Sequence, residues 1–185
     1  MTAMTSSMPR AFRRFGRDRR GVSAVEFAFI APLMIGLYLG CVEVSDGVAA
    51  DRKVSLVAGA LANLTARVAT ISTADMTNIL DASSAIIAPY AAGNLKMTVS
   101  CLNIDANKNM TVKWTATRNG GVGGTMSVPL ALAVANSQLI FSQVSYAYTP
   151  VVGYTITGTL TLSDKMYMSP RISAPSYPDA AHPCS

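Results

Sequence analysis

The feature that most constrains this chain is a long uncharged apolar stretch close to its N-terminus. No charged side chain occurs between residues 27 and 42, and the sequence stays largely apolar from residue 22 to residue 44. A helix rises by about 1.5 Å per residue, so one of this length reaches across the hydrocarbon core of a bilayer. The sequence therefore predicts a transmembrane helix over residues 22–45, with a separate domain after it.

A basic leader, residues 1–21, precedes this helix. Residues 1–20 carry six arginines against Asp18, a net charge of +5 that equals the formal charge of the whole chain. Such a bias predicts a cytoplasmic N-terminus and places residues 46–185 on the outer side of the membrane. Nucleic-acid binding needs basic residues clustered on a folded surface. Because the rest of the chain is electrically neutral, we expect no nucleic-acid partner.

Glu26 lies just inside the apolar segment, where a carboxylate is costly. Near the bilayer centre the cost is about 2.5–3.5 kcal/mol, and nearer the interface it is lower. Glu26 therefore predicts either a positively charged partner or a position at the headgroup boundary, where a carboxylate is tolerated.

These residues resemble a known processing site. Gly21, with Glu26 five positions after it and Pro32 inside the apolar helix, resembles the cleavage region of type IV prepilins. Residues 21–33 are similar to the TadE/TadF-like minor pseudopilins of tight-adherence (Flp, type IVc) pilus systems. The resemblance implies that a prepilin peptidase cuts after Gly21 and leaves Val22 as the new N-terminus.

The same resemblance implies roles for residues along the helix. Glu26 would pair with the free amine of Val22 on a neighbouring subunit, and Pro32 would let the helix loosen during assembly. Phe27 stands where the major Flp subunits usually carry tyrosine, and the C-terminal region is far larger than theirs. We therefore expect a minor pseudopilin rather than the main fibre subunit, with Glu26, Phe27 and Pro32 as assembly residues.

Two other interpretations of the apolar segment stay open. Residues 48–51 fit a signal peptidase site, which would make the product a secreted domain that starts at Asp51. A chain that keeps its leader would instead be an anchored extracytoplasmic binding domain with no place in a pilus. Gly36 and Gly40 are spaced for close helix packing, although glycine is also common in membrane helices.

Helical spacing continues beyond the membrane segment and then gives way to alternation. Apolar residues from 54 to 71 recur at intervals of three and four, which predicts that the first helix extends through this stretch. Thr73 is expected to cap a second helix that Pro89 ends. Strands are predicted over residues 96–104, 110–118, 139–148 and 154–167, before an irregular proline-rich tail.

The fold class expected is α+β and, by resemblance, pilin-like. It has a long N-terminal transmembrane and amphipathic helix, a second short helix and a small antiparallel sheet. The strand residues expected on the inner face of that sheet are Met97, Val99, Cys101, Ile104, Val112, Trp114, Ala116, Val144, Tyr146 and Tyr148.

The remaining chemistry-bearing residues favour no catalytic or metal site. Cys101 and Cys184 either pair as a disulfide in an oxidising compartment or remain two thiols, since spacing cannot establish connectivity. His182 is the only histidine, and residues 105–109 begin like a calcium loop but lack its glycine and glutamate. The glycine-rich stretch 119–124 lacks the lysine of a phosphate-binding loop. We expect no catalytic residue, no cofactor and no bound metal.

The chain is thus predicted to be a single-pass protein of the bacterial inner membrane with a periplasmic C-terminal domain. The resemblance implies three kinds of partner: the prepilin peptidase, other pilin-like and pilus-assembly proteins that contact the N-terminal helix, and the lipid bilayer.

Overall fold

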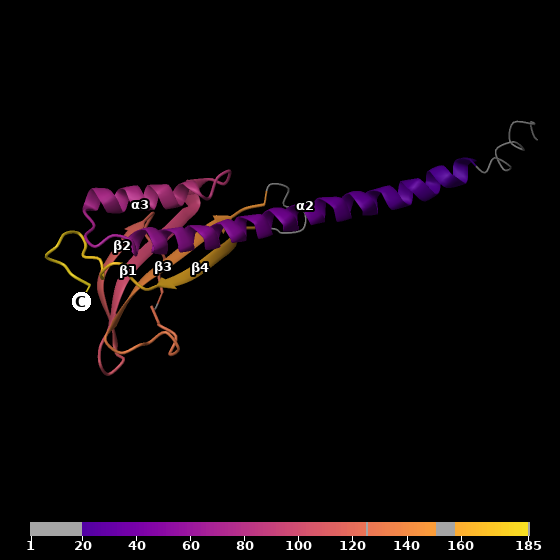
Figure 1. Cartoon of the computed structure of the whole chain (residues 1–185). Helices are drawn as coiled ribbons and strands as arrows, with labels where there is room; N and C mark the ends of the chain where they lie inside the picture. The colour runs from indigo at the N-terminus through magenta and orange to yellow at the C-terminus, as the bar shows by residue number, and fades with distance from the viewer. Residues whose placement is uncertain (1–19, 125, 151–157, 185) are drawn as a thin grey trace, which may run out of the picture. The chain divides into compact units, whose positions relative to one another are not determined.

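The computed structural model describes residues 20–124, 126–150 and 158–184. The chain divides into two units, Met1–Val42 and Glu43–Ser185. Within the described residues, the first unit holds the start of helix α2 (Arg20–Thr65), and the second holds the rest of α2, helix α3 and a four-stranded sheet (Figure 1). The α+β fold class is confirmed. The leader residues 1–19 lie outside the described residues.

Helix α2 continues from the apolar segment into the second unit, as the spacing predicts. There, one side of the helix is buried, and its residues recur at intervals of three and four. The fully buried residues of this stripe include Ala50, Val54, Val57 and Leu61. The helix ends at Thr65, so Val68 and Ile71, which the spacing assigns to it, lie in the connection that follows. Ile71 is buried there because its backbone pairs with the C-terminal tail.

Helix α3 (Thr73–Ala85) is capped by Ser72 and not by Thr73. Ser72 has extended backbone angles, and its hydroxyl accepts a hydrogen bond from the backbone N–H of Asp75 (3.1 Å). The Asp75 carboxylate in turn accepts one from the backbone N–H of Ser72 (3.2 Å), which completes a capping box. The pKa of Asp75 lies below its usual value because its carboxylate accepts hydrogen bonds from Ser72. The bond from the Ser72 side chain has the larger effect, and the bond from the Ser72 backbone has the smaller one.

A lysine of α2 holds the C-terminal end of α3. Lys53 Nζ donates hydrogen bonds to the backbone carbonyls of Ile86 (3.3 Å) and Ala88. These carbonyls have no partner within the helix, and a positive charge at a helix C-terminus is favourable. Pro89 follows directly, in the position where the sequence places the end of this helix.

The strands form one antiparallel sheet in the order β2-β1-β3-β4. Their bounds are β1 Leu95–Ile104, β2 Met110–Arg118, β3 Ser137–Tyr148 and β4 Leu160–Met168. Helix α3 and the C-terminal half of α2 lie over one face of this sheet (Figure 1), and the main hydrophobic core fills the space between them.

The fourth strand is shorter than the sequence suggests. It begins at Leu160 rather than at residue 154. The described residues just before it, Gly158 with φ of 98° and Thr159, lie outside the strand. Residues 154–157 of the expected strand lie outside the described residues.

A bulge in β2 decides which side chains of the first hairpin face the helices. Cys101 pairs with Trp114, but the next residue, Leu102, pairs with Val112, so Lys113 is an extra residue without a partner. One extra residue moves the side chains beyond it to the other face. Val112, which alternation places beside Trp114, is therefore 45% exposed.

Ile104 also lies on the face opposite to the expected one. It is an odd number of residues from Cys101 in an unbroken strand, so the two side chains point to opposite faces. Ile104 belongs to a second, smaller hydrophobic cluster with Leu102, Leu139 and Phe141. The other inner-face assignments are confirmed: Met97, Val99, Cys101, Trp114, Ala116, Val144, Tyr146 and Tyr148 all lie in the main core.

Both turns singled out in the sequence are local structural features. Asp105 Oδ1 accepts a hydrogen bond from the backbone N–H of Asn109 (2.7 Å), which closes the turn between β1 and β2. The glycine-rich stretch forms the loop after β2. Within it, Gly121 has φ of 65°, and a Cβ there would lie 2.8 Å from the Thr117 side chain, so only glycine fits.

We predict that Ser72→Ala destabilises the domain by about 1 kcal/mol, because the N-terminal N–H groups of α3 lose their acceptor. Thr73→Ala is the matched control and should change stability by less than about 0.5 kcal/mol, since it lies just inside the helix and is exposed. Thermal denaturation of the two variants at neutral pH measures the difference. Equal losses of stability in the two variants would contradict the assignment of Ser72 as the cap.

The same pair predicts a pH dependence. The folded-state pKa of Asp75 is lowered, so its contribution to stability is present above the unfolded-state pKa and is lost as the pH falls through the folded-state value. The wild type should therefore lose stability between about pH 4 and lower values more steeply than Ser72→Ala does. Parallel slopes would show that the capping box does not determine this titration.

Candidate functional site

The first part of α2 presents apolar side chains on every side of the helix. Phe27, Phe29 and Tyr38 are 72%, 79% and 69% exposed. Mean hydropathy reaches 2.0 over 18 residues of the helix, none of them buried, so by length and composition α2 can cross a membrane. Such a helix is compatible with a single-pass membrane anchor, because all of its central backbone polar groups are paired internally.

The predicted processing site lies in the first turn of this helix. α2 begins at Arg20, so Gly21 and Val22 already have helical conformation. Nothing lies within 4 Å of the place that a Cβ would take at Gly21, and both residues are exposed. A cut between them would leave Val22 at the helix N-terminus, beside backbone N–H groups that have no acceptor within the helix.

Glu26 follows Val22 by four residues, so the two lie on the same side of α2, one turn apart. The Glu26 side chain is exposed and makes no hydrogen bond or ion pair with any residue that the structure describes. Its carboxylate is therefore accessible to a positive group from another chain. Phe27 beside it is exposed as well, which suits contact with lipid or with another helix.

Further along, Pro32 lies inside the helix without ending it. The bend that a proline often causes stays a prediction. Gly36 has nothing within 4 Å of its Cβ position, and Gly40 follows one turn later on the same side. Two glycines at this spacing on a helix are typical of sites where a second helix approaches closely, so the helix-packing role of Gly36 and Gly40 stays a prediction.

The sequence analysis did not single out Glu43, the residue of α2 at which burial begins. Glu43 is the first residue of the second unit and only 2% exposed, although glutamate is rarely buried. Counting back in helical intervals from Ala50 through Gly47 leads to Glu43, and that spacing could have found it. Burial, the Asp46 carboxylate and, more weakly, Glu43 raise the pKa of the nearby Tyr148 phenol.

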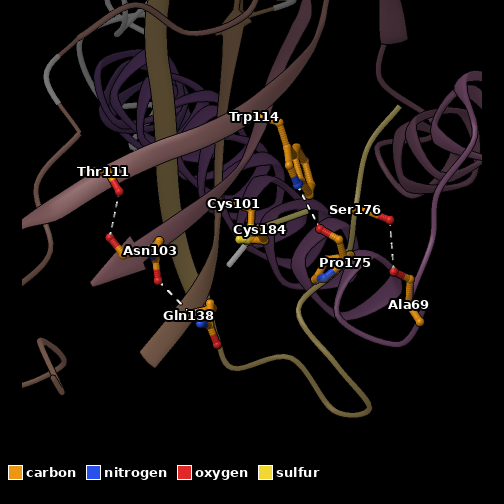
Figure 2. The surroundings of a disulfide bond; sticks show 9 residues. All are labelled: Ala69, Cys101, Asn103, Thr111, Trp114, Gln138, Pro175, Ser176 and Cys184. Atoms are coloured by element: carbon orange, nitrogen blue, oxygen red, sulfur yellow. Dashed lines mark hydrogen bonds between the residues drawn. A yellow bond between two sulfur atoms is a disulfide. The ribbon is translucent and has the colours of Figure 1, made fainter. Parts of the chain in front are cut away.

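The cysteine pair lies in the second unit, where the structure joins Cys101 of β1 to Cys184 in a disulfide (Figure 2). The two Cα atoms are 5.9 Å apart, and neither residue has exposed surface. The structure therefore contains the Cys101–Cys184 disulfide, which the spacing of the cysteines could not establish. Cys41 is a free and exposed cysteine of the first unit.

Polar contacts hold the tail in place before the disulfide. Trp114 Nε1 donates a hydrogen bond to the backbone carbonyl of Pro175 (2.9 Å), as Figure 2 shows. The backbone of Ser176 pairs with the connection between the helices: Ile71 N–H donates to Ser176 O (2.9 Å), and Ser176 N–H donates to Ala69 O (3.1 Å). The tail is therefore attached to the core at Pro175, Ser176 and Cys184, which are buried, while residues 178–183 are exposed.

The tail also contains the only histidine. His182 Nδ1 lies 2.8 Å from Asp179 Oδ1, and this hydrogen bond is the main cause that lowers the pKa of Asp179. Both side chains are largely exposed, and the contact closes a turn of the tail. Among the residues described, no group of three or more His, Cys, Asp or Glu side chains is placed to hold a metal ion.

We predict that Cys184→Ser releases the tail and destabilises the domain by about 2–5 kcal/mol, because the disulfide closes a long loop of the unfolded chain. The cysteines are separated by 83 positions. Trp114, the only tryptophan, contacts the tail and reports its release by fluorescence. Cys41→Ser is the control and should melt as the wild type does. Unchanged melting and protease resistance of Cys184→Ser would contradict the assigned role of the tail.

The comparison with known families identifies the first part of the chain. Residues 21–62 match the family described as TadE-like protein. The match begins at Gly21, next to the predicted cut, and covers nearly all of α2. Neither the search of curated proteins nor the search of solved structures gave a match. The resemblance inferred from Gly21, Glu26 and Pro32 is thereby confirmed: residues 21–62 are similar to TadE-like proteins, which is consistent with Tad pilus systems.

Proposed function

We propose that this chain is a minor pseudopilin that takes part in the assembly of a tight-adherence pilus. The main observation behind this proposal is that the TadE-like match begins where the arginine-rich leader ends. The TadE-like match starts at Gly21, after the arginine-rich leader, and runs along the helix whose first part is exposed and apolar. The helix is thus the shared element, and the function assigned to the chain is assembly through it.

The proposed sequence of events starts with the leader. Its arginines keep the N-terminus cytoplasmic, and the prepilin peptidase removes residues 1–21. The new amine of Val22 and the carboxylate of Glu26 then lie one turn apart on the same side of the helix. Two subunits that pack side by side can therefore exchange amine-to-carboxylate contacts in a medium of low dielectric constant, where such contacts are strong. The chain needs no catalytic group for this role.

The proposed location of residues 43–185 is the periplasm. The Cys101–Cys184 disulfide supports an oxidising compartment, since such bonds rarely persist in the cytosol. The positive charge of the leader supports the same orientation.

The alternative function, a secreted or anchored binding domain, has less support. A signal peptidase cut before Asp51 would fall after Ala50, which lies in the middle of α2 and has no exposed surface. Such a cut would remove Glu43 and Ala50 from the buried stripe. Mass-spectrometric mapping of the mature N-terminus separates the possibilities: Val22 for the pseudopilin, Asp51 for a secreted domain, and an intact leader for a plain anchored protein.

We predict that Gly21→Leu leaves the leader attached and blocks pilus assembly without preventing membrane insertion. The added side chain would occupy the space next to the cut bond, where glycine presents only backbone. Gly36→Leu, at a glycine of the same helix that also has open space at its Cβ position, is the control and should be cleaved normally. Recovery of Gly21→Leu with Val22 at its N-terminus would show that the cut is assigned wrongly.

We predict that Glu26→Gln is cleaved normally but assembles poorly, because the amine of Val22 on a neighbouring subunit loses its counter-charge. Recovery of pilin-like partners by co-purification should fall by about tenfold, which corresponds to about 1.4 kcal/mol. Glu26→Asp keeps the charge and should restore part of the recovery. Normal partner recovery and normal pili with Glu26→Gln would leave the carboxylate at the headgroup boundary without a role in assembly.

A further inference from the structure

Asn119 and Gly120 form the centre of the tight turn that follows β2. The backbone N–H of Gly121 donates a hydrogen bond to the carbonyl of Arg118 (3.0 Å), and the φ angles of Asn119 and Gly120 are 51° and 80°. Positive φ at both central positions is the mark of a type I′ turn, for which Asn-Gly is a preferred pair. This pair occurs once in the sequence, and both of its residues are exposed. Turn geometry accounts for the residue types and leaves the Asn119 side chain available for a further contact.

The Asn119 side chain joins this turn to the chain that leads into β1. Its Nδ2 donates a hydrogen bond to the backbone carbonyl of Leu95 (2.7 Å). The carbonyl oxygens of Ala92 and Gly93 lie 3.4 and 3.5 Å from the same nitrogen, and both residues belong to the short 3-10 helix η1 (Ala92–Asn94). The backbone pairing of β1 with β2 ends before these residues. The amide contact of Asn119 therefore extends the association of the two segments past their last backbone pair.

This amide contact lies at the end of the sheet where α2 enters the second unit. Leu95 pairs with Tyr146 of β3. The ring centre of Tyr146 is 6.2 Å from that of Tyr90, and the Tyr90 hydroxyl donates a hydrogen bond to the backbone carbonyl of Asp46 in α2 (3.1 Å). Loss of the amide contact of Asn119 would therefore loosen the sheet next to the tyrosines that pack beside α2.

The Asn-Gly pair is also chemically reactive. Attack of the Gly120 nitrogen on Cγ of Asn119 closes a five-membered ring, and glycine has no Cβ to obstruct the approach. The Gly120 N–H donates no hydrogen bond to any residue that the structure describes, so the fold does not hold the attacking nitrogen. Both residues are exposed, which lets water reach the N–H proton. These three properties favour ring closure at Asn119.

We propose that Asn119 is a site of spontaneous covalent modification, in which its side-chain amide becomes a carboxylate through a cyclic imide. The bond from Gly120 N to Asn119 Cγ forms and the bond from Cγ to Nδ2 breaks. The Gly120 proton passes through water to the departing nitrogen, which leaves as ammonia. Water then adds to either imide carbonyl and opens the ring to aspartate or isoaspartate, and no atom is oxidised or reduced. The reaction needs only the turn and water, so it does not depend on the proposed role in a pilus.

The product cannot make the amide contact. A carboxylate at neutral pH has no hydrogen to donate, and it would face the carbonyl oxygens of Leu95, Ala92 and Gly93, which are acceptors as well. The modification therefore separates the turn from η1 and β1 permanently. In the unmodified protein the same hydrogen bonds hold the side-chain amide away from ring closure. The rate of modification in the folded protein thus reports how often the amide contact opens.

The first test follows the wild-type full chain, purified in detergent and incubated in mildly alkaline heavy-oxygen water, which labels acid formed during the incubation. Peptide mapping uses a protease that does not cut after Arg118. Asn107 is the control within the same molecule, because it is exposed in a turn and is followed by Lys108. We expect labelled aspartate and isoaspartate at residue 119 to form about tenfold faster than at Asn107, since glycine leaves ring closure unobstructed. Equal rates, no label at residue 119, or aspartate without its isomer would each overturn the proposal.

The second test measures the consequence with two substitutions at one position. Asn119→Asp introduces the charge of the product, whereas Asn119→Gly removes the side chain and adopts the positive φ without strain. We expect Asn119→Asp to melt at a lower temperature than both Asn119→Gly and the wild type, and hydrogen exchange of residues 92–98 to be about tenfold faster in it than in the wild type. Aged wild-type protein, sorted by peptide mass, gives the same exchange comparison without a substitution. Melting of Asn119→Asp equal to that of the wild type or of Asn119→Gly would contradict the assigned consequence.

Discussion

The rest of this structure depends on a single helix that meets two different surroundings. From residue 27 to residue 42 the side chains of α2 are uncharged and mostly exposed, which suits a hydrocarbon solvent. From Glu43 the same helix buries one stripe against a sheet. The stripe at Ala50, Val54, Val57 and Leu61 supplies much of the core, because a sheet of this size needs a helix to cover its apolar face. Fold and proposed function therefore share one element.

The second constraint is the closure of the core by the C-terminal tail. Cys184 bonds to Cys101 in β1, one of the two central strands of the sheet. The indole of Trp114 and the backbone of Ser176 fix the same segment from two other directions. A tail rich in proline forms few regular backbone hydrogen bonds, so the backbone pairing at Ser176, the contact with the Trp114 indole and one covalent bond determine its position. The disulfide therefore joins a residue near the end of the described chain to the centre of the sheet.

The surroundings of the helix come from both inside and outside the TadE-like segment. The TadE-like segment ends near the end of α2, whereas Ile86 and Met166, which lie beside the outward side of this helix, are far outside that segment. Residues of the sheet domain therefore also lie beside the outward side of the helix. Packing on the inward side at Val57 and Leu61 keeps Leu56 and Gly59 turned outward.

What the sequence determined by itself was local: the long apolar helix, the Gly21 to Pro32 motif and the strands of the first hairpin, because helical and strand periodicity act between near neighbours. Tertiary structure decided the points at which distant segments meet. Ile71 leaves the helix because its backbone pairs with Ser176, and a single extra residue at Lys113 turns Val112 toward solvent. The Cys101–Cys184 bond and the burial of Glu43 also required the fold, since no local pattern specifies which residues lie together across the core.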